Sequence, residues 1–291
     1  MSHRITIPCN PANPVNYLAC CGLFDLLARM DSGALGWWQT TAPVAFLLES
    51  EIAETEFAST VLHTLCSKAC WKFVCSAEGD TPVRLVAELT LPGKAAFAVS
   101  LDWWLETAEE DGTIRDKSAW KMYAGQQTVE GIIADMLTEA AKLRTGLRGG
   151  IPLAGLLDQS AEMTGRFGFD PRASRNALDV GYSPNDLHLP VRTFVFAELL
   201  ATFGLHSFFP ARTGPAGRLQ STRGWRGADD GEGEKGFAYC LWPEPLPIAL
   251  ARLAAAYPAS TGARALFAPR AMRKNYSNLT LARTTPSIVT T

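Results

Sequence analysis

The stretch from Val15 to Met30 constrains the fold of this 291-residue chain more than any other. Its apolar residues recur mostly at the i, i+3, i+4 spacing of one helix face, and a turn-rich entry, Asn10–Pro14, precedes it. Gly22 interrupts this helix at a cost of about 1 kcal/mol relative to alanine. A glycine at this place favours the close approach of another backbone.

Further strands and helices are predicted on both sides of a long irregular stretch. Alternation or short apolar runs predict strands, and periodicity near 3.6 residues predicts helices. Between Thr145 and Leu189 this periodicity fades and glycine, proline and asparagine become frequent, which is typical of functional or mobile segments. The predicted strands are Arg4–Pro8, Val44–Leu48, Val83–Leu91, Ala95–Leu101 and Phe237–Trp242; the predicted helices are Glu51–Cys70, Val129–Leu143, Val191–Phe203 and Pro247–Tyr257; and Thr213–Lys235 is predicted to be a charged loop.

This order of elements predicts an α+β fold. A mixed sheet with helices is expected in residues 1–145, and a basic, loop-rich and more helical region is expected in residues 146–291. The boundary between them is soft, and a single domain is the alternative.

Charge is divided unevenly along the chain. Residues 1–140 contain 18 Asp/Glu and 9 Lys/Arg, whereas residues 141–291 contain 11 Asp/Glu and 18 Lys/Arg, so the net charge of −2 conceals two opposed halves. A basic half can neutralise nucleic-acid phosphates, and an acidic half can meet a basic partner subunit. The alternative is an uneven distribution that has no function because the halves interleave in space.

Membrane and secretory classes are not expected. No 18 uncharged apolar residues occur in a row, and the residues from Met1 to Pro8 lack the basic stretch and apolar run of a secretory signal. The seven cysteines are odd in number and are therefore expected to be reduced thiols in a cytoplasmic protein.

The sequence offers little support for catalysis. It lacks the Gly-x-Ser-x-Gly, Ser-x-x-Lys, phosphate-loop and Gly-x-Gly-x-x-Gly motifs. Cys66, Cys70 and Cys75 form the nearest metal motif, but a structural zinc site usually supplies two separated pairs, so buried inert thiols are favoured. We therefore expect no enzyme activity, metal or cofactor.

Polar, basic and aromatic residues instead gather in three irregular segments. They are Lys117–Thr128, Arg144–Gly150 and 165–185. Glutamine and asparagine can read base edges, lysine and arginine can neutralise phosphates, and aromatic rings can stack on bases. For Arg166 and Arg172 the alternative is a structured loop whose arginines pair with Asp170 and Asp179.

Four blocks of sequence carry a resemblance to a known family. The first is Asn13-Pro-x-x-Tyr-Leu-Ala-Cys-Cys-Gly-Leu-Phe-Asp-Leu-Leu-Ala-Arg29, and the second is Ala124–Gln127, with the letters Ala-Gly-Gln-Gln. The third is Gly-Arg-Phe-Gly-Phe-Asp-Pro-Arg at 165–172 with its continuation at 179–185, and the fourth is the aromatic strand and Trp-x-x-Pro-Leu-Pro at 237–247. In this order they resemble the large-subunit family of type I-U (also called I-G) CRISPR effector complexes.

The resemblance implies a non-catalytic subunit of a crRNA-guided surveillance complex (Cascade). Such a subunit binds target double-stranded DNA, recognises the protospacer-adjacent motif (PAM), stabilises the R-loop and recruits the helicase-nuclease. Expected partners are crRNA and the backbone, crRNA-processing and small subunits. Expected DNA-binding and PAM-reading residues are Gln126, Gln127, Asn185 and Lys121; expected phosphate contacts are Lys117, Arg148, Arg166, Arg172, Arg175, Arg223 and Arg226.

Two other functions stay open on the sequence. A metal-dependent nuclease or hydrolase would use Asp170, Asp179 and Asp186 near His188, because such carboxylates can hold Mg²⁺. A structural adaptor of the complex would make no nucleic-acid contact, and its arginines would serve internal pairs or protein interfaces.

Overall fold

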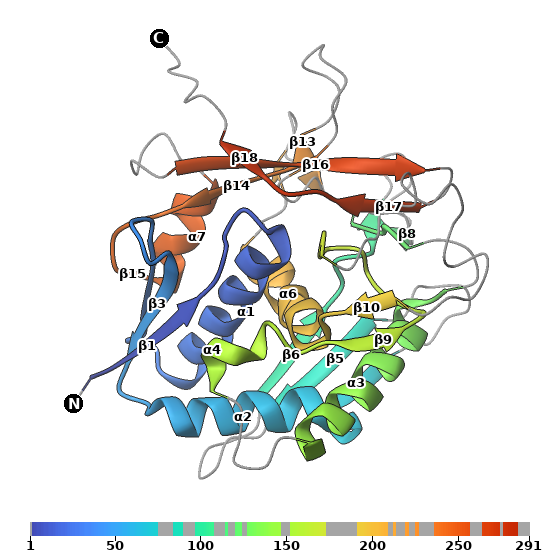
Figure 1. Cartoon of the computed structure of the whole chain (residues 1–291), viewed down its shortest axis with the longest axis horizontal. Helices are drawn as coiled ribbons and strands as arrows, with labels where there is room; N and C mark the ends of the chain where they lie inside the picture. Colours follow the sequence, from blue (N-terminus) through green and yellow to red (C-terminus); the bar gives the residue numbers. More distant parts are fainter. Residues whose placement is uncertain are drawn as a thin grey trace.

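Two buried helices, α1 (Pro14–Met30) and α6 (Val195–Phe208), pack against each other at the centre of the computed structural model (Figure 1). The predicted helix at Val15–Met30 is confirmed. The structure describes residues 2–74, 84–89, 97–107, 114–115, 120–123, 127–146, 152–172, 191–208, 212–213, 219–220, 225–226, 236–256, 264–273 and 276–284.

Helix α1 begins where its sequence predicts an N-terminus. The side chain of Asn13 accepts a hydrogen bond from the backbone N–H of Val15 at 3.1 Å, and Pro14 occupies the first helical turn. The predicted close approach at Gly22 is also confirmed, because a Cβ atom there would overlap the carbonyl oxygen of Leu200 on α6. Gly204 makes the reciprocal contact: a Cβ atom on it would overlap the carbonyl oxygen of Leu18.

The first strands form a four-stranded antiparallel sheet beside α1. Its order is β1 (His3–Pro8), β3 (Ala45–Ser50), β2 (Leu35–Gln39) and β15 (Leu246–Pro247). The strands predicted at Arg4–Pro8 and Val44–Leu48 are confirmed, whereas β2 was not predicted. Since β15 lies on β2, a segment from residues 146–291 completes a sheet of residues 1–145.

A second antiparallel sheet contains β4 (Trp71–Val74), β5 (Arg84–Leu89) and β6 (Phe97–Leu101). The predicted pairing of the strands at 83–91 and 95–101 is confirmed. The helix predicted at Glu51–Cys70 is too long, because α2 covers only Glu54–Cys66 and is followed by the 3-10 turn η1 (Lys68–Cys70). Helix α2 packs against α3 (Val129–Gly146). The helix predicted at Val129–Leu143 is confirmed by α3.

A third antiparallel sheet crosses the end of the molecule opposite α2 (Figure 1). It contains β14 (Gly236–Leu241), as predicted, with β13 (Trp225–Arg226), β16 (Arg264–Arg273), β17 (Tyr276–Leu279) and β18 (Arg283–Thr284). Helix α7 (Ile248–Ala256) confirms the predicted helix near Pro247. The prediction of a more helical C-terminal part is wrong for β16, β17 and β18, which belong to a sheet.

Short elements complete the α+β fold. They are β7 (Glu106–Thr107), β8 (Ile114–Arg115), α4 (Leu153–Leu156), β9 (Ala161–Met163), β10 (Val191–Thr193), β11 (Arg212–Thr213) and β12 (Leu219–Gln220). The helix predicted from Val191 starts later, because β10 pairs with β9 and α6 begins at Val195. All strand pairs in the described residues are antiparallel, so the predicted mixed sheet is wrong there.

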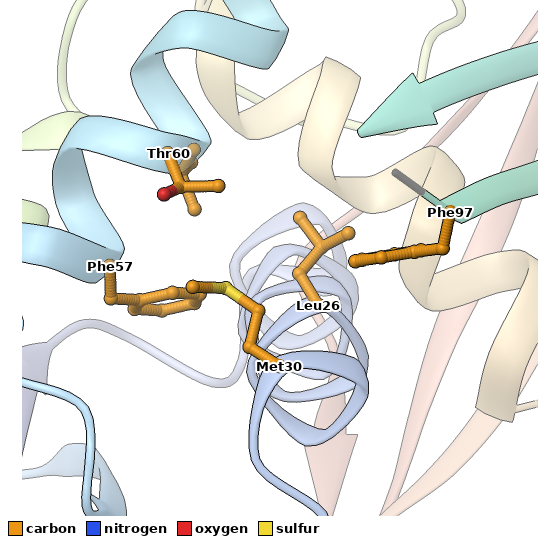
Figure 2. Close-up of a pocket in the computed structure, with 6 residues that line it drawn as sticks. Leu26, Met30, Phe57, Thr60 and Phe97 are labelled. Carbon is orange, nitrogen blue, oxygen red and sulfur yellow. The ribbon is translucent and has the colours of Figure 1, made fainter. Parts of the chain in front are cut away.

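A small apolar recess lies where α1, α2 and β6 meet (Figure 2). The hydroxyl of Thr60 donates to the carbonyl oxygen of Glu56 in its own helix at 3.1 Å, so it is already paired. The lining contains no charged side chain and is a packing feature of the core. Its residues are Leu26, Met30, Phe57, Thr60, Val61 and Phe97.

Candidate functional site

Asp170, in the third motif block, is the centre of a buried polar cluster. Its carboxylate is fully buried and accepts a hydrogen bond from Asn13 Nδ2 at 3.0 Å. It also accepts from Arg172 Nη2 at 2.8 Å, from Arg172 Nε at 3.1 Å and from the backbone N–H of Arg172 at 2.8 Å. A buried carboxylate needs such donors. Since Asn13 belongs to the first motif block, its hydrogen bond to Asp170 joins the first and third blocks.

The local backbone explains how Asp170 reaches this position. Gly168 has a φ of 86°, a left-handed conformation that glycine adopts readily. Phe167 and Phe169 on either side of it are fully buried and stack at 5.4 Å between ring centroids. Asp170 follows directly, where the N-terminus of α1 supplies Asn13.

The guanidinium of Arg172 is engaged by several internal partners. Beyond Asp170, it donates to Asp158 Oδ1 at 2.8 Å, to the carbonyl oxygen of Leu157 at 3.1 Å and to Asn16 Oδ1 at 3.4 Å. It also lies 3.6 Å from the centroid of the Phe194 ring. The Arg172–Asp170 pair that the sequence allowed as an alternative is therefore present. A phosphate contact by Arg172 stays a prediction, and most of its donors would have to be shared or released to make it.

Glu198 on α6 is the second fully buried carboxylate of the cluster. Its Oε1 atom accepts a hydrogen bond from the backbone N–H of Asp170 at 3.1 Å. Burial, and then the nearby charge of Asp170, raise the pKa of Glu198 to about 8, although backbone donors and Arg166 oppose the shift. A large share of Glu198 side chains is therefore protonated near neutral pH.

Arg166 faces Glu198 from the third motif block. Burial lowers the pKa of its guanidinium, and the charge of Glu198 opposes that effect. Within the part of the chain that the structure describes, neither the buried Nη1 of Arg166 nor the buried Oε2 of Glu198 has a hydrogen-bond partner. This pairing by charge alone leaves Arg166 the less firmly held of the two described arginines in the block.

Glu198 predicts a pH dependence of stability that glutamine should remove. The folded state holds the Glu198 proton up to about pH 8, whereas the ordinary pKa of a Glu in an unfolded chain is 4.5. The free energy of unfolding should therefore fall as pH rises through this window, by at most about 1.4 kcal/mol per pH unit. Glu198→Gln keeps the acceptor for Asp170 and should lack this fall. Urea denaturation at several pH values measures it.

The exposed Glu130 on α3 provides the control for this experiment. Glu130→Gln should leave the pH profile of stability parallel to that of the wild-type protein, because Glu130 is exposed and lies outside the buried cluster. If Glu198→Gln gave the same parallel profile, Glu198 would not hold its proton in the folded protein.

An aromatic cluster brings the fourth motif block to the others. Trp120, just before the second block, packs edge-on against Phe169 and Phe237, with ring centroids 5.8 and 4.8 Å away. Tyr17 on α1 lies 4.4 Å from Tyr239 on β14, whose hydroxyl donates to the carbonyl oxygen of Pro11 at 2.7 Å. The aromatic residues of the blocks therefore form one core.

A third buried carboxylate, outside the cluster, ties the first block to α7. Asp25 on α1 accepts hydrogen bonds from Arg29 Nε at 2.8 Å and from Arg252 Nη2 at 2.7 Å. Arg252 lies on α7, far from Asp25 in the sequence, so this ion pair joins two distant segments. The motif residues of α1 are thus held by the hydrogen bond from Asn13 to Asp170 and by the ion pairs of Asp25.

Two other predicted site residues lie near the cluster. Gln127 is half-buried, and its Nε2 atom donates to the carbonyl oxygen of Thr164, directly before the third block, at 3.4 Å. Lys121 is half-buried and lies 5.5 Å from the centroid of the Tyr123 ring. Gln127 therefore contacts the residue that follows β9, two residues before Arg166.

For the remaining predicted site residues the structure gives no side-chain position. Arg226 lies in β13, and only its backbone is described. Lys117, Gln126, Arg148, Arg175, Asn185 and Arg223 lie outside the described residues, as do Asp179, Asp186 and His188 of the nuclease alternative.

Sequence reasoning missed Asn13, Asn16 and Glu198 as members of the cluster. Glu198 had a readable signal, because a single carboxylate in the apolar run of α6 must find donors or become protonated. Asn13 was visible only as a turn residue before Pro14 and as the first residue of the first motif block. In the described ranges no group of three His, Cys, Asp or Glu side chains could hold a metal ion.

Comparisons with known proteins assign this chain to no family. No protein-family model, curated protein or solved structure matches it significantly. In the described residues no helix is both long and apolar enough to cross a membrane. The four motif blocks and the cluster in which they meet are the features of this chain that point to a function.

Proposed function

We propose that this protein is a non-catalytic, large-type subunit of a type I CRISPR crRNA-guided surveillance complex. The observation that carries the proposal is the meeting of the four motif blocks that resemble this family. Asn13 of the first block binds Asp170 of the third, and Gln127 of the second contacts the residue before the third. Tyr17 of the first block packs against Tyr239 of the fourth, with ring centroids 4.4 Å apart. Blocks that are far apart in the sequence thus form one unit.

Within such a complex the protein binds target double-stranded DNA, recognises the PAM, stabilises the R-loop and recruits the helicase-nuclease. Its partners are crRNA and the backbone, crRNA-processing and small subunits. The excess of Lys and Arg in residues 141–291 supports contact with phosphates, because each neutralised phosphate releases a counterion.

The residues proposed for each contact follow from their chemistry. Side-chain amides can form paired hydrogen bonds with base edges, and arginine or lysine can neutralise phosphates. Arg166 is a better phosphate candidate than Arg172, because Arg172 already donates to Asp170 and Asp158. The proposed PAM readers are Gln126, Gln127 and Asn185 with Lys121, and the other proposed phosphate contacts are Lys117, Arg148, Arg175, Arg223 and Arg226.

Reconstitution of the complex with and without this subunit tests the proposal. Target binding is measured on duplexes that carry every flanking trinucleotide, at two salt concentrations. We expect both affinity and flank preference to be lost without the subunit. If binding persists with its preference intact, the PAM is read elsewhere and the protein is a structural adaptor.

Single glutamine variants then test the PAM contact. Gln126→Ala and Gln127→Ala should each weaken binding to the preferred flank by about 1–3 kcal/mol and relax the preference. Gln39→Ala is the matched control, because Gln39 ends β2, outside the proposed contact residues, and its amide likewise donates to a backbone carbonyl oxygen, that of Pro43. Equal effects in all three variants would contradict the assignment.

A further inference from the structure

Two thiols lie in contact beside the first motif block. Cys9 follows β1 and is partly exposed, whereas Cys20 is fully buried in α1. Their sulfur atoms are 3.6 Å apart, so the thiols share a weak hydrogen bond. The segment between them contains Asn13 and Asn16, which hold Asp170 and Arg172.

We propose that Cys9 and Cys20 form a reversible disulfide when the protein meets a low-molecular-weight disulfide such as oxidised glutathione. The Cys9 thiolate attacks one sulfur of the oxidant, which forms a mixed disulfide and releases one thiol. Cys20 then loses its proton and attacks the Cys9 sulfur, which closes the protein disulfide and releases the second thiol. Two protein thiols are oxidised and one small disulfide is reduced, so electrons and protons balance.

The geometry requires little movement. A disulfide has a sulfur–sulfur distance of about 2.05 Å, so the two atoms must approach by about 1.6 Å. Cys9 lies outside helix and strand in the described chain, so this residue can move while Cys20 keeps its place on α1. Exposure gives Cys9 access to the oxidant, and burial raises the pKa of Cys20, so Cys9 reacts first.

Other described thiols are less suited to this reaction. Cys66 donates to the carbonyl oxygen of Ala140 at 3.4 Å, and burial raises its pKa to about 11. Cys21, next to Cys20, is fully buried, and burial likewise raises its pKa. In the pair of Cys9 and Cys20, by contrast, Cys9 is partly exposed to the oxidant and its sulfur already contacts the sulfur of Cys20.

The bridge would tighten the first motif block. Because it closes the connection between β1 and α1, it limits the freedom of the unfolded chain at the segment that carries Asn13 and Asn16. We expect the oxidised protein to melt about 5 °C higher than the reduced protein. Reduction by excess thiol should reverse the shift.

Oxidised glutathione, alkylation and peptide mapping test the bridge. Residues 5–29 form one tryptic peptide that contains Cys9, Cys20 and Cys21, so cleavage beside Tyr17 is needed to separate the linked halves. The full chain and Cys21→Ala should form the bridge and gain thermal stability, whereas Cys9→Ser and Cys20→Ala should do neither. Linkage to Cys21, glutathione retained on Cys9 without a bridge, or unreacted thiols would each overturn the proposal.

Discussion

Replacing Gly22 with alanine should lower the free energy of unfolding by about 3 kcal/mol or more, and Gly204→Ala should do the same. At each position the added methyl group would overlap a backbone carbonyl oxygen of the opposite helix, Leu200 for Gly22 and Leu18 for Gly204. A carbonyl in a helix cannot turn aside as a flexible side chain can. Helices α1 and α6 must therefore move apart, and the closely packed core between them loses contacts.

Gly146→Ala is the matched control for these two variants. Gly146 is the last residue of α3. Apart from its chain neighbours and the nearby backbone of its own helix, no described atom lies within 4 Å of the position that its Cβ would occupy. Alanine there should leave stability unchanged or raise it by up to about 1 kcal/mol. Urea denaturation followed by circular dichroism measures all three variants. Gly22→Ala at wild-type stability would show that the helices are not packed this closely.

Gly22 and its helix show how much of the fold can be predicted from the sequence. Helix α1, its entry at Asn13–Pro14 and the role of Gly22 all follow from local patterns, and all are confirmed. Strand β2 was missed because Gly36, Trp37 and Trp38 are all buried, which removes the alternation that marks a half-exposed strand. Strand β16 was missed because Pro269 within it argues against a paired strand.

The buried cluster was less predictable than the helices, for a physical reason. Asn13 and Asp170 are 157 residues apart, and no local periodicity reports a hydrogen bond over that separation. The sequence did supply the pair of Asp170 and Arg172, since an aspartate and an arginine two residues apart can meet in a turn. The sequence could not predict that the guanidinium of Arg172 would lie over the ring of Phe194. This position restricts its use for phosphate binding.

Asp170→Ala should have the second large effect, a loss of about 3–5 kcal/mol of stability. The carboxylate is fully buried, and its removal leaves Arg172 and Asn13 with donors that no longer have their acceptor. Such a loss costs more than the pair contributes, because the remaining charge stays partly buried. Relief of the repulsion between Asp170 and Glu198 should offset only part of the loss, because the pKa of Glu198 is already raised to about 8.

Asp158 offers a control on the same arginine. Its carboxylate lies 2.8 Å from Arg172 Nη1, but its side chain is 71% exposed. Asp158→Ala should therefore cost less than about 1 kcal/mol. Because both aspartates bind one guanidinium, the difference between the two variants reports the burial of Asp170 together with its hydrogen bonds from Asn13 and the backbone N–H of Arg172. Equal stability of the two variants in urea would contradict a central role for Asp170.

Arg172→Ala and the double variant Asp170→Ala/Arg172→Ala complete a thermodynamic cycle. Removing both partners should cost less than the sum of the single losses, since neither charge is then left alone. The cycle also separates folding from nucleic-acid binding. If Asp170→Ala and Arg172→Ala weaken target binding only as far as they unfold the subunit, the pair holds the motif blocks together, and the phosphate contacts lie with other residues such as Arg166. If Arg172→Ala weakens binding in a complex that remains assembled, its guanidinium leaves Asp158 to bind phosphate.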